Sequence, residues 1–229
     1  LIRYCLSKGE ENTAPIAGKD VVFVLGNTGA GKSTLINYLC GCEMENARRR
    51  DIGLSGRGSV IRVKADQRDT AVTKIGHDMQ KSATFLPSVA VSITDGKVYC
   101  DCPGFLDNRG AEINIANAVN TRAMISAAKS VRLLVLINYK SIEADRGRGL
   151  QDMVKILLQM FATEEALQLH QQSILLGVTR YPLKGDRDAG DLNDLRDEFF
   201  PKARKTANSN GDSDSEENED EAAKVLQSL

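Results

Sequence analysis

The 229-residue sequence lacks a strong net charge, a disulfide-like density of cysteines and any long apolar run. A formal net charge of -1 provides no overall field toward nucleic acid or an anionic membrane, so we expect no nucleic-acid partner. The chain has five cysteines, an odd number and too few for a disulfide-stabilised scaffold of this length, which indicates reduced thiols and a cytoplasmic protein. No run approaches the ~20 apolar residues that cross a bilayer, which predicts a chain without a transmembrane segment.

The cysteines also give little support for a metal site. Cys40 and Cys42, like Cys100 and Cys102, are separated by one residue, whereas zinc knuckles have CxxC-like spacing and further ligands. On a strand, alternation points Cys100 and Cys102 to the same face, where they act as small apolar residues. We therefore expect no zinc site.

With 41% hydrophobic and 27% charged residues, the chain is long enough to bury one sizeable α/β core. We expect a lead-in segment over 1–18, one domain over 19–202, and an acidic, disordered tail over 203–229. Because the first residue is Leu1 rather than Met, a fragment of a longer protein is one expectation that we keep.

A basic insertion is predicted over about 45–80 within this domain. Two strand-like pieces, 59–65 and 71–75, predict a hairpin there. Its cations have two interpretations, a solvated face or a surface that steers a partner or phosphate. Between residues 48 and 74 the sequence contains eight basic residues and three acidic ones: Arg48, Arg49, Arg50, Arg57, Arg62, Lys64, Arg68 and Lys74, and Asp51, Asp66 and Asp69.

A glycine-rich stretch, GNTGAGKST, lies between an apolar run at 21–25 and a helical apolar pattern at 35–39. This context predicts a strand, a loop and a helix. In a GxxxxGKS pattern the glycines let successive N–H groups turn inward, and the helix N-terminus favours anions. Lys32 would then meet the β- and γ-phosphates, and Ser33 would ligate Mg²⁺. The predicted nucleotide-binding residues of this loop are Gly26, Asn27, Thr28, Gly29, Ala30, Gly31, Lys32, Ser33 and Thr34.

An acidic motif, Asp-Cys-Pro-Gly at 101–104, follows a predicted hairpin over 89–100 whose turn contains Asp-Gly. A residue at the C-terminal end of a strand lies at the rim where open parallel sheets bind ligands. Asp101 can there hold the water shell of Mg²⁺ while the N–H of Gly104 reaches the γ-phosphate. The two motifs together predict that Asp101 lies close to Ser33.

The remaining chain alternates helical and strand patterns. Such alternation predicts an α/β fold, with a mainly parallel sheet between helices. The continuous apolar run at 132–138 is typical of a buried parallel strand. The other elements expected from periodicity are a helix over 114–129, a helical stripe over 149–161, a strand over 173–179 and a helix over 192–200.

With the loop GNTGAGKST, the strand end DCPG and the strand ILLGVTR in this order, the chain resembles a translation-factor-class P-loop GTPase. It is most similar to septin-like and immunity-associated (GIMAP-like) G domains, over about 20–200. The resemblance implies a three-layer P-loop NTPase fold, with helices on both faces of the sheet and an antiparallel hairpin strand. It also implies a Mg²⁺-dependent guanine-nucleotide-binding switch or assembly GTPase that binds GTP or GDP and hydrolyses slowly alone.

The resemblance further implies roles for single residues. In such domains a threonine of the first switch loop completes the Mg²⁺ coordination, and Ser82-Ala83-Thr84 is similar to the Ser-x-Thr found there. Thr84 is therefore the candidate, with Thr70 and Thr73 as rivals, although the interval from Ser33 is longer than usual. The resulting assignment gives Lys32, Thr84 and Gly104 catalytic roles and makes Ser33, Thr84 and Asp101 the metal set.

The chain departs from the guanine-reading pattern, which would fall at Thr179 and Arg180. Its aspartate is absent, and that acid normally accepts two hydrogen bonds from the guanine edge. Arg180 could lie along the purine face, and Asp186 or Asp188 are the acids that could reach the base from the next loop. ATP is accordingly not excluded, and an ATP-binding P-loop ATPase or kinase is an alternative.

Phe105 stands where water-orienting family members have glutamine, and a phenyl ring cannot hold a water. One alternative is therefore a nucleotide-binding interaction module that does not hydrolyse. If the site does hydrolyse, an arginine such as Arg109, Arg146 or Arg148 could act across a homodimer at the nucleotide face. We also expect a protein effector, whose identity the sequence does not give.

Overall fold

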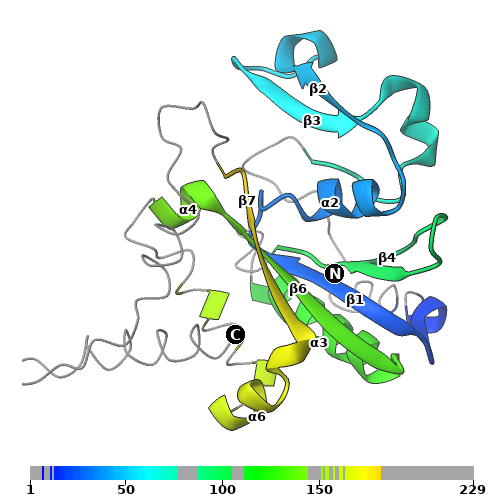
Figure 1. Cartoon of the computed structure of the whole chain (residues 1–229), viewed down its shortest axis with the longest axis vertical. Coiled ribbons are helices and arrows are strands. Elements are labelled where there is room, and N and C mark those ends of the chain that lie inside the picture. The colour runs from blue at the N-terminus through cyan, green and yellow to red at the C-terminus, as the bar shows by residue number, and fades with distance from the viewer. Residues whose placement is uncertain are drawn as a thin grey trace, which may run out of the picture. The chain divides into compact units, whose positions relative to one another are not determined.

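A computed structural model of the chain describes residues 13–76, 87–104, 111–143 and 163–181, together with the single residues 7, 11, 151, 153, 154, 157, 160 and 161. The chain forms two compact units, Leu1–Leu136 and Ile137–Leu229. Five strands form one sheet in the order β4-β5-β1-β6-β7, and β2 and β3 form a separate two-stranded sheet (Figure 1). The coarse prediction of an α/β fold with a mainly parallel sheet is confirmed.

Strand β1, Asp20–Gly26, occupies the centre of the sheet. It pairs in parallel with β5, Val98–Asp101, on one side and with β6, Ser130–Asn138, on the other. Phe23, Val24 and Leu25 are fully buried, although successive side chains of a strand point to opposite faces. Both faces of the sheet are therefore covered at β1, which is why its sequence is continuously apolar.

Helix α2, Lys32–Leu39, follows β1 directly. It ends where the sequence predicts, because Gly41 adopts a left-handed φ of 94° just after the C-cap Cys40. Ile36 is fully buried on the helix face that meets the sheet. The core cluster at this contact comprises Val24, Ala30, Ile36, Cys40, Ala90, Tyr99 and Leu136.

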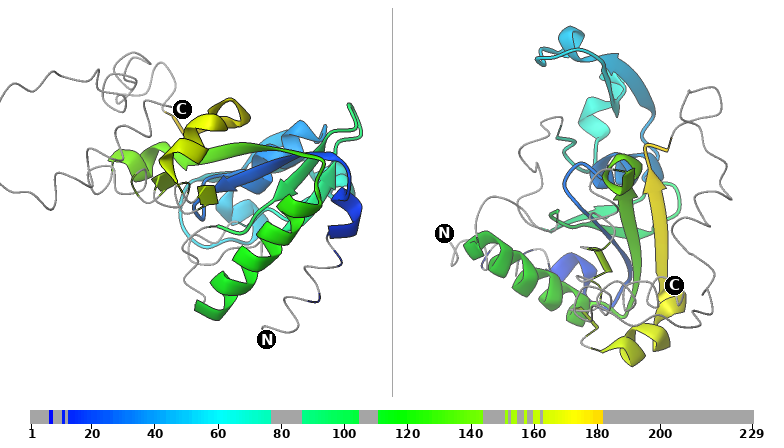
Figure 2. Two further views of the ribbon diagram at one scale, coloured as in Figure 1. Left: turned by 90° about the horizontal axis from the view of Figure 1, so that it is seen from below. Right: turned by 90° about the vertical axis from the view of Figure 1, so that its left-hand side faces the viewer.

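Helix α3, Ala111–Ala127, lies alongside the sheet of the first unit and leads into β6 (Figure 2). Its Ala116 and Met124 are buried together with Asn117 and Asn120, whereas Ile115 and Val119 are exposed, so the helix is not clearly amphipathic. The short helix η1, Ala14–Ile16, precedes β1, and the N–H of Gly18 donates to the Ala127 carbonyl over 2.9 Å. The end of the lead-in segment is thus packed onto α3.

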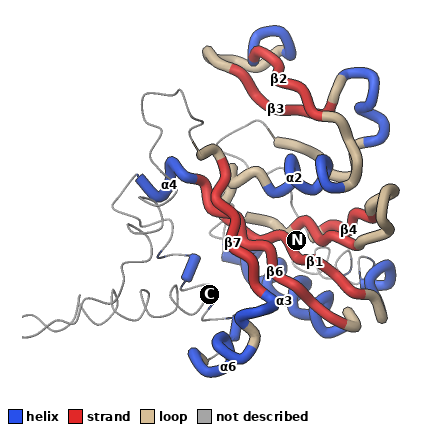
Figure 3. Tube along the Cα trace, viewed as in Figure 1, coloured by secondary structure: helices blue, strands red, loops and turns tan. Residues whose placement is uncertain are grey.

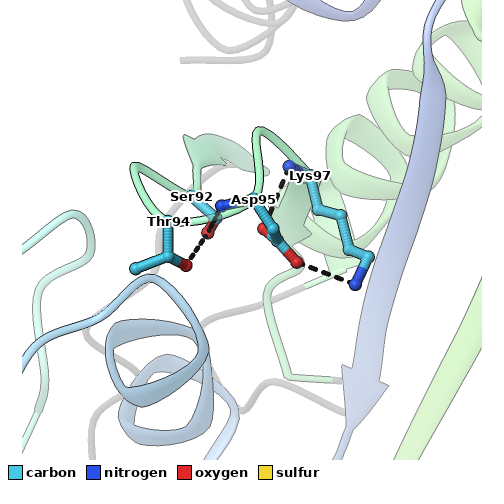
Figure 4. Close-up of polar contacts among 4 residues, drawn as sticks. All are labelled: Ser92, Thr94, Asp95 and Lys97. Atoms are coloured by element: carbon cyan, nitrogen blue, oxygen red, sulfur yellow. Dashed lines mark hydrogen bonds and ion pairs between the residues drawn. The ribbon is translucent and has the colours of Figure 1, made fainter.

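A tight hairpin joins β4, Ser88–Val91, to β5 in antiparallel register. In the turn, the Asp95 carboxylate accepts from the Lys97 N–H at 3.2 Å and pairs with Lys97 Nζ at 2.7 Å (Figure 4). The hydrogen bonds from Lys97 and Ser92 lower the pKa of Asp95 to about 2. Since β5 follows this turn at once, the turn sets the register that places Asp101 at the end of the strand.

The basic insertion is an antiparallel ribbon of β2, Met44–Arg48, and β3, Ser59–Val63 (Figure 3). The connection contains η2, Arg49–Ile52, and the ribbon is followed by η3, Ala65–Thr70. The insertion contains a hairpin, but the predicted pairing of 59–65 with 71–75 is wrong, because 71–75 is not a strand. β3 pairs instead with β2, which lies before it in the sequence. The backbone at 72–73 forms hydrogen bonds with the Asn37 side chain of α2 and, among the described residues, with no strand.

The second unit contains α4, Tyr139–Glu143, α6, Glu164–Leu169, η5, Gln171–Ser173, and β7, Ile174–Thr179. The strand expected over 173–179 is confirmed, whereas α6 was not anticipated. In the helical stripe expected at 149–161, the described residues Met153, Val154 and Leu157 are buried. The helix expected over 192–200 and the tail over 203–229 lie outside the described residues, so the domain limits remain predictions.

Candidate functional site

The loop between β1 and α2, residues 26–34, is called the glycine loop below. Gly26 has a φ of 144°, and a Cβ built there would lie 2.3 Å from the Leu136 carbonyl oxygen of β6. Only glycine fits at that close approach. Gly31 has a left-handed φ of 88° and is the N-cap of α2. These two glycines are therefore required by the turn of the chain from the strand into the helix.

The first backbone amides of α2 lie at the end of the glycine loop. The N–H of Leu35 donates to the Gly31 carbonyl over 2.9 Å, and the amides of 32–34 precede that bond at the open end of the helix. Such an end attracts anions through its N–H groups and its dipole. Within the described residues, the buried Oδ1 of Asn27 has no hydrogen-bond donor, so the loop contains an acceptor that a bound molecule could use.

Lys32 places its ammonium group over the start of the glycine loop. Its Nζ donates to the carbonyl oxygens of Gly26 at 2.8 Å and Asn27 at 3.1 Å. The residue is only 7% exposed, which is rare for lysine and is tolerated because these carbonyl dipoles solvate the charge. A cation is thus held beside the helix N-terminus.

Ser33 and Asp101 meet at the end of the sheet. The Ser33 hydroxyl donates to Asp101 Oδ2 over 2.6 Å, across 68 residues of sequence. Asp101 is 1% exposed and comes from the C-terminal end of β5, next to the end of β1. A hydroxyl and a carboxylate are hard oxygen ligands of the kind that Mg²⁺ prefers. The expected proximity is present, while the metal role of the pair stays a prediction.

Gly104 brings the acidic motif into contact with the glycine loop. A Cβ at Gly104 would lie 2.5 Å from Thr28 Oγ1 and 2.8 Å from the Thr28 backbone nitrogen. Any side chain there would have to displace the loop. The N–H of Cys102 also donates to the Val24 carbonyl of β1 over 3.4 Å. The two sequence motifs therefore form one continuous surface in the first unit.

Asn37 is a site residue that the motif reasoning missed. This fully buried side chain of α2 donates to the Ser33 carbonyl at 2.8 Å and to the Thr73 carbonyl at 2.9 Å. Its Oδ1 accepts from the N–H groups of Val72 at 2.9 Å and Thr73 at 3.3 Å. It clamps the segment after η3 onto the helix that carries Lys32 and Ser33. An amide inside the otherwise apolar pattern at 35–39 was the available signal.

The threonine candidates have different outcomes. Thr73 is buried, and its hydroxyl donates to the Ser33 carbonyl over 3.1 Å, so it is engaged in the Asn37 clamp. Thr70 donates to the Gln67 carbonyl over 2.7 Å on the surface. Thr84 lies outside the described residues, and its role stays a prediction. The same holds for Phe105, Arg109, Arg146, Arg148, Asp186 and Asp188.

Thr179 and Arg180 belong to the second unit, at the end of β7. The Thr179 hydroxyl donates to the Ile137 carbonyl over 3.4 Å. Arg180 has a φ of 56°, the only positive value at a non-glycine residue in the described part of the chain. Such a conformation is uncommon outside turns and special sites. The rings of Tyr139 and Tyr181 meet edge to face with centroids 5.1 Å apart beside it.

The cysteine pairs lie in the core of the first unit. Cys100 and Cys102 are buried on the same side, as expected, with their sulfur atoms 3.9 Å apart. Burial, with Cys42 and Asp95 nearby, raises the pKa of the Cys40 thiol to about 11. A protonated, buried thiol is a poor nucleophile and a poor metal ligand. These residues therefore contribute to packing.

Comparison of the chain with protein-family models, with curated proteins and with solved structures gave no match. Any functional proposal therefore rests on the sequence motifs and on the contacts just described. In the part of the chain that the structure describes, no three His, Cys, Asp or Glu residues gather as metal ligands. No helix in the same part is long and apolar enough to cross a membrane.

Proposed function

We propose that the first unit binds a purine nucleoside triphosphate with Mg²⁺, GTP being the nucleotide that the sequence favours, and that the chain acts as a switch or assembly GTPase. The observation that carries the proposal is the 2.6 Å contact between the Ser33 hydroxyl and Asp101, beside the buried ammonium of Lys32. Ser33 and Asp101 come from separate motifs, and a strand-to-helix turn does not require their contact.

In this proposal, each residue of the site has its own role in binding the triphosphate. The amides at the α2 N-terminus and Lys32 would hold the phosphate oxygens, which stay close to backbone because Gly26 and Gly31 carry no side chains. Ser33 would ligate Mg²⁺ directly, and Asp101 would hold its water shell. The ion, when bound, supplies charge neutralisation at the phosphates. Gly104, in contact with Thr28, would sense the terminal phosphate through its N–H.

The fold that we propose is a three-layer P-loop NTPase fold of the G-domain type. Its support is the order of strand, glycine loop and helix, with the acidic motif on the strand adjacent to β1. The antiparallel β4 at the edge of the sheet agrees with the expected hairpin strand.

The choice of guanine rests on the resemblance, since the base-reading aspartate is absent beyond Arg180. The left-handed backbone of Arg180 supports a special role for this strand end. Thr179 and Arg180 are therefore the base-reading candidates that the resemblance implies. A preference for ATP would defeat the guanine part and leave the phosphate site intact.

The decisive experiment is equilibrium binding of fluorescent GTP, GDP and ATP in the presence of Mg²⁺. We expect GTP to bind, and Lys32→Ala to weaken binding by at least about tenfold, because a charge-assisted contact to phosphate is lost. Lys19→Ala removes an exposed lysine just before β1 and is the matched control, with unchanged binding. Absence of binding to all three nucleotides, or equal affinity of the Lys32→Ala variant, would refute the proposal.

A non-hydrolysing interaction module is the second candidate, favoured by Phe105 at the water-orienting position. Single-turnover assays with excess protein separate the two. Slow release of phosphate that accelerates with protein concentration supports a GTPase that completes its site across a homodimer. A γ-phosphate that stays intact for hours at high protein concentration supports the module.

A further inference from the structure

A second concave site lies on the β2–β3 ribbon, in the basic insertion. Asn46 and Arg48 of β2, Arg50 of η2, and Arg57 and Ser59 line a cavity of about 540 Å³ together with two glycines. The volume lies in the range of small-molecule sites, about 300–1,000 Å³, but all of its lining residues are exposed, so the site is an open depression on the ribbon surface. The proposed nucleotide function uses none of these residues.

Charge is distributed unevenly along the ribbon. At its base the cations are neutralised by the opposite strand, since Arg62 pairs with Glu45 at 2.7 Å and Lys64 pairs with Glu43. At the cavity, the ion pair of Arg50 among the described residues is with the exposed Asp51, at 3.6 Å. Within the described part of the chain, Arg48 and Arg57 form no ion pair. Three guanidinium groups therefore surround one cavity with a single carboxylate beside them.

The loop that carries these arginines has a defined structure. The N–H of Arg49 donates to the Gly58 carbonyl at 3.0 Å, and its guanidinium donates to the Ser55 carbonyl at 2.7 Å. The N–H of Leu54 closes the loop onto the Arg49 carbonyl at 2.9 Å. Arg49 thus holds the loop, while its neighbours Arg48 and Arg50 remain with the cavity. Such a scaffold lowers the entropy cost of gathering cations around a ligand.

We infer that this cavity binds a small ligand that carries two or more phosphate groups. Guanidinium groups match phosphate oxygens in bidentate geometry, and the Ser59 hydroxyl and Asn46 amide add donors without negative charge. Three arginines line the depression, so clustered phosphates match their charge better than a single phosphate group does. The same chemistry occurs in a soluble polyphosphorylated compound and in a phosphoinositide headgroup.

The test uses sodium tripolyphosphate as the probe and isothermal titration calorimetry as the readout. The whole chain carries Lys32→Ala in every sample, so that binding at the glycine loop does not contribute. We expect Arg48→Gln with Arg57→Gln to weaken tripolyphosphate binding at least about tenfold, because two charge-assisted contacts are lost. Lys64→Gln with Arg68→Gln removes the same charge from the same insertion outside the cavity, and we expect less than about threefold weakening.

Absence of tripolyphosphate binding, or equal weakening by both double variants, would overturn the inference, since the attraction would then be absent or merely electrostatic. Tighter binding of a poly(U) RNA that depends on Arg48 and Arg57 would also overturn it in favour of a nucleic-acid surface. Urea unfolding followed by circular dichroism, with a midpoint equal to that of the unaltered chain, shows that Arg48→Gln with Arg57→Gln is folded. Failure of GTP to bind the unaltered chain would contradict the proposed function and leave the calorimetry unaffected.

Vesicles distinguish the two sources of phosphate. Phosphatidylcholine vesicles with and without phosphatidylinositol 4,5-bisphosphate are sedimented with the protein. Arginine-dependent sedimentation with the phosphoinositide vesicles alone identifies a lipid headgroup as the ligand. Tripolyphosphate binding without sedimentation identifies a soluble polyphosphorylated compound.

Discussion

Single polar side chains hold the candidate site together. Lys32, Ser33 and Asn37 all project from α2, and each makes its contacts with a different segment of the chain. Asn37 satisfies backbone groups of the segment at 72–73 that no strand or helix satisfies. An unmade buried hydrogen bond costs more than a made one contributes, so Asn37 is the most sensitive of the three for stability.

Replacing Asn37 by alanine should therefore destabilise the protein by about 2–4 kcal/mol, from orphaned backbone groups and a small cavity. Urea unfolding followed by circular dichroism measures the loss. Asn46→Ala, at an exposed position of β2, is the control and should change stability by less than about 0.5 kcal/mol. Similar stability of the two variants would show that the clamp contributes little.

At the scale of elements, the β4–β5 hairpin positions the acidic motif. Its turn is closed by Asp95, whose pKa is lowered to about 2 by hydrogen bonds from Lys97 and Ser92. A carboxylate with a lowered pKa stabilises the folded state above its unfolded value, and the contribution disappears as pH falls through the folded pKa. The stability that Asp95 contributes is therefore lost as the pH falls from about 4 to about 2.

Asp95→Asn should lower the melting temperature at pH 7, and the difference from the unaltered chain should shrink as pH falls below about 4. Thermal unfolding at several pH values measures both effects. The matched control, Asp69→Asn, removes an exposed carboxylate of η3 and should leave the melting temperature nearly unchanged. A difference at Asp95 that is independent of pH would contradict the electrostatic explanation.

For the whole molecule, the buried thiols and the buried tyrosine of the first unit predict that stability falls at alkaline pH. Burial raises the pKa of Cys40 to about 11 and that of Tyr99 above its usual value. The hydrogen bond with Cys102, together with burial, raises the pKa of Cys100. The folded state therefore keeps protons that the unfolded chain releases first. This contribution is complete below the unfolded pKa of a thiol, about 9, and is lost as pH rises toward about 11.

We expect the free energy of unfolding to fall between pH 8 and pH 10.5, and Cys40→Ala to reduce that fall. Urea unfolding at the two pH values measures the change. For each protein, the free energy of unfolding at pH 10.5 is compared with its own value at pH 8. The packing loss caused by removal of the thiol is the same at both pH values and therefore cancels. An identical fall in the variant would exclude Cys40 as a contributor.

Local patterns were sufficient for most of the sheet and for the glycine loop. The apolar run of β1 and the alternation of β4 and β5 depend on burial that repeats every one or two residues. The second strand of the basic insertion was placed wrongly, because 71–75 has strand-like residues but its backbone bonds Asn37. A partner 35 residues away in sequence leaves no periodic signal.

The sequence by itself determined the order of strand, loop and helix and the positions of Lys32, Ser33 and Asp101 on them, since glycine geometry and apolar periodicity act over a few residues. The two motifs also predicted that Asp101 lies close to Ser33, which the 2.6 Å hydrogen bond confirms. Only the tertiary structure decided that Asn37 holds Thr73. It also decided that Arg48, Arg50 and Arg57 surround one cavity. These contacts depend on how distant segments pack, which short-range propensity does not encode.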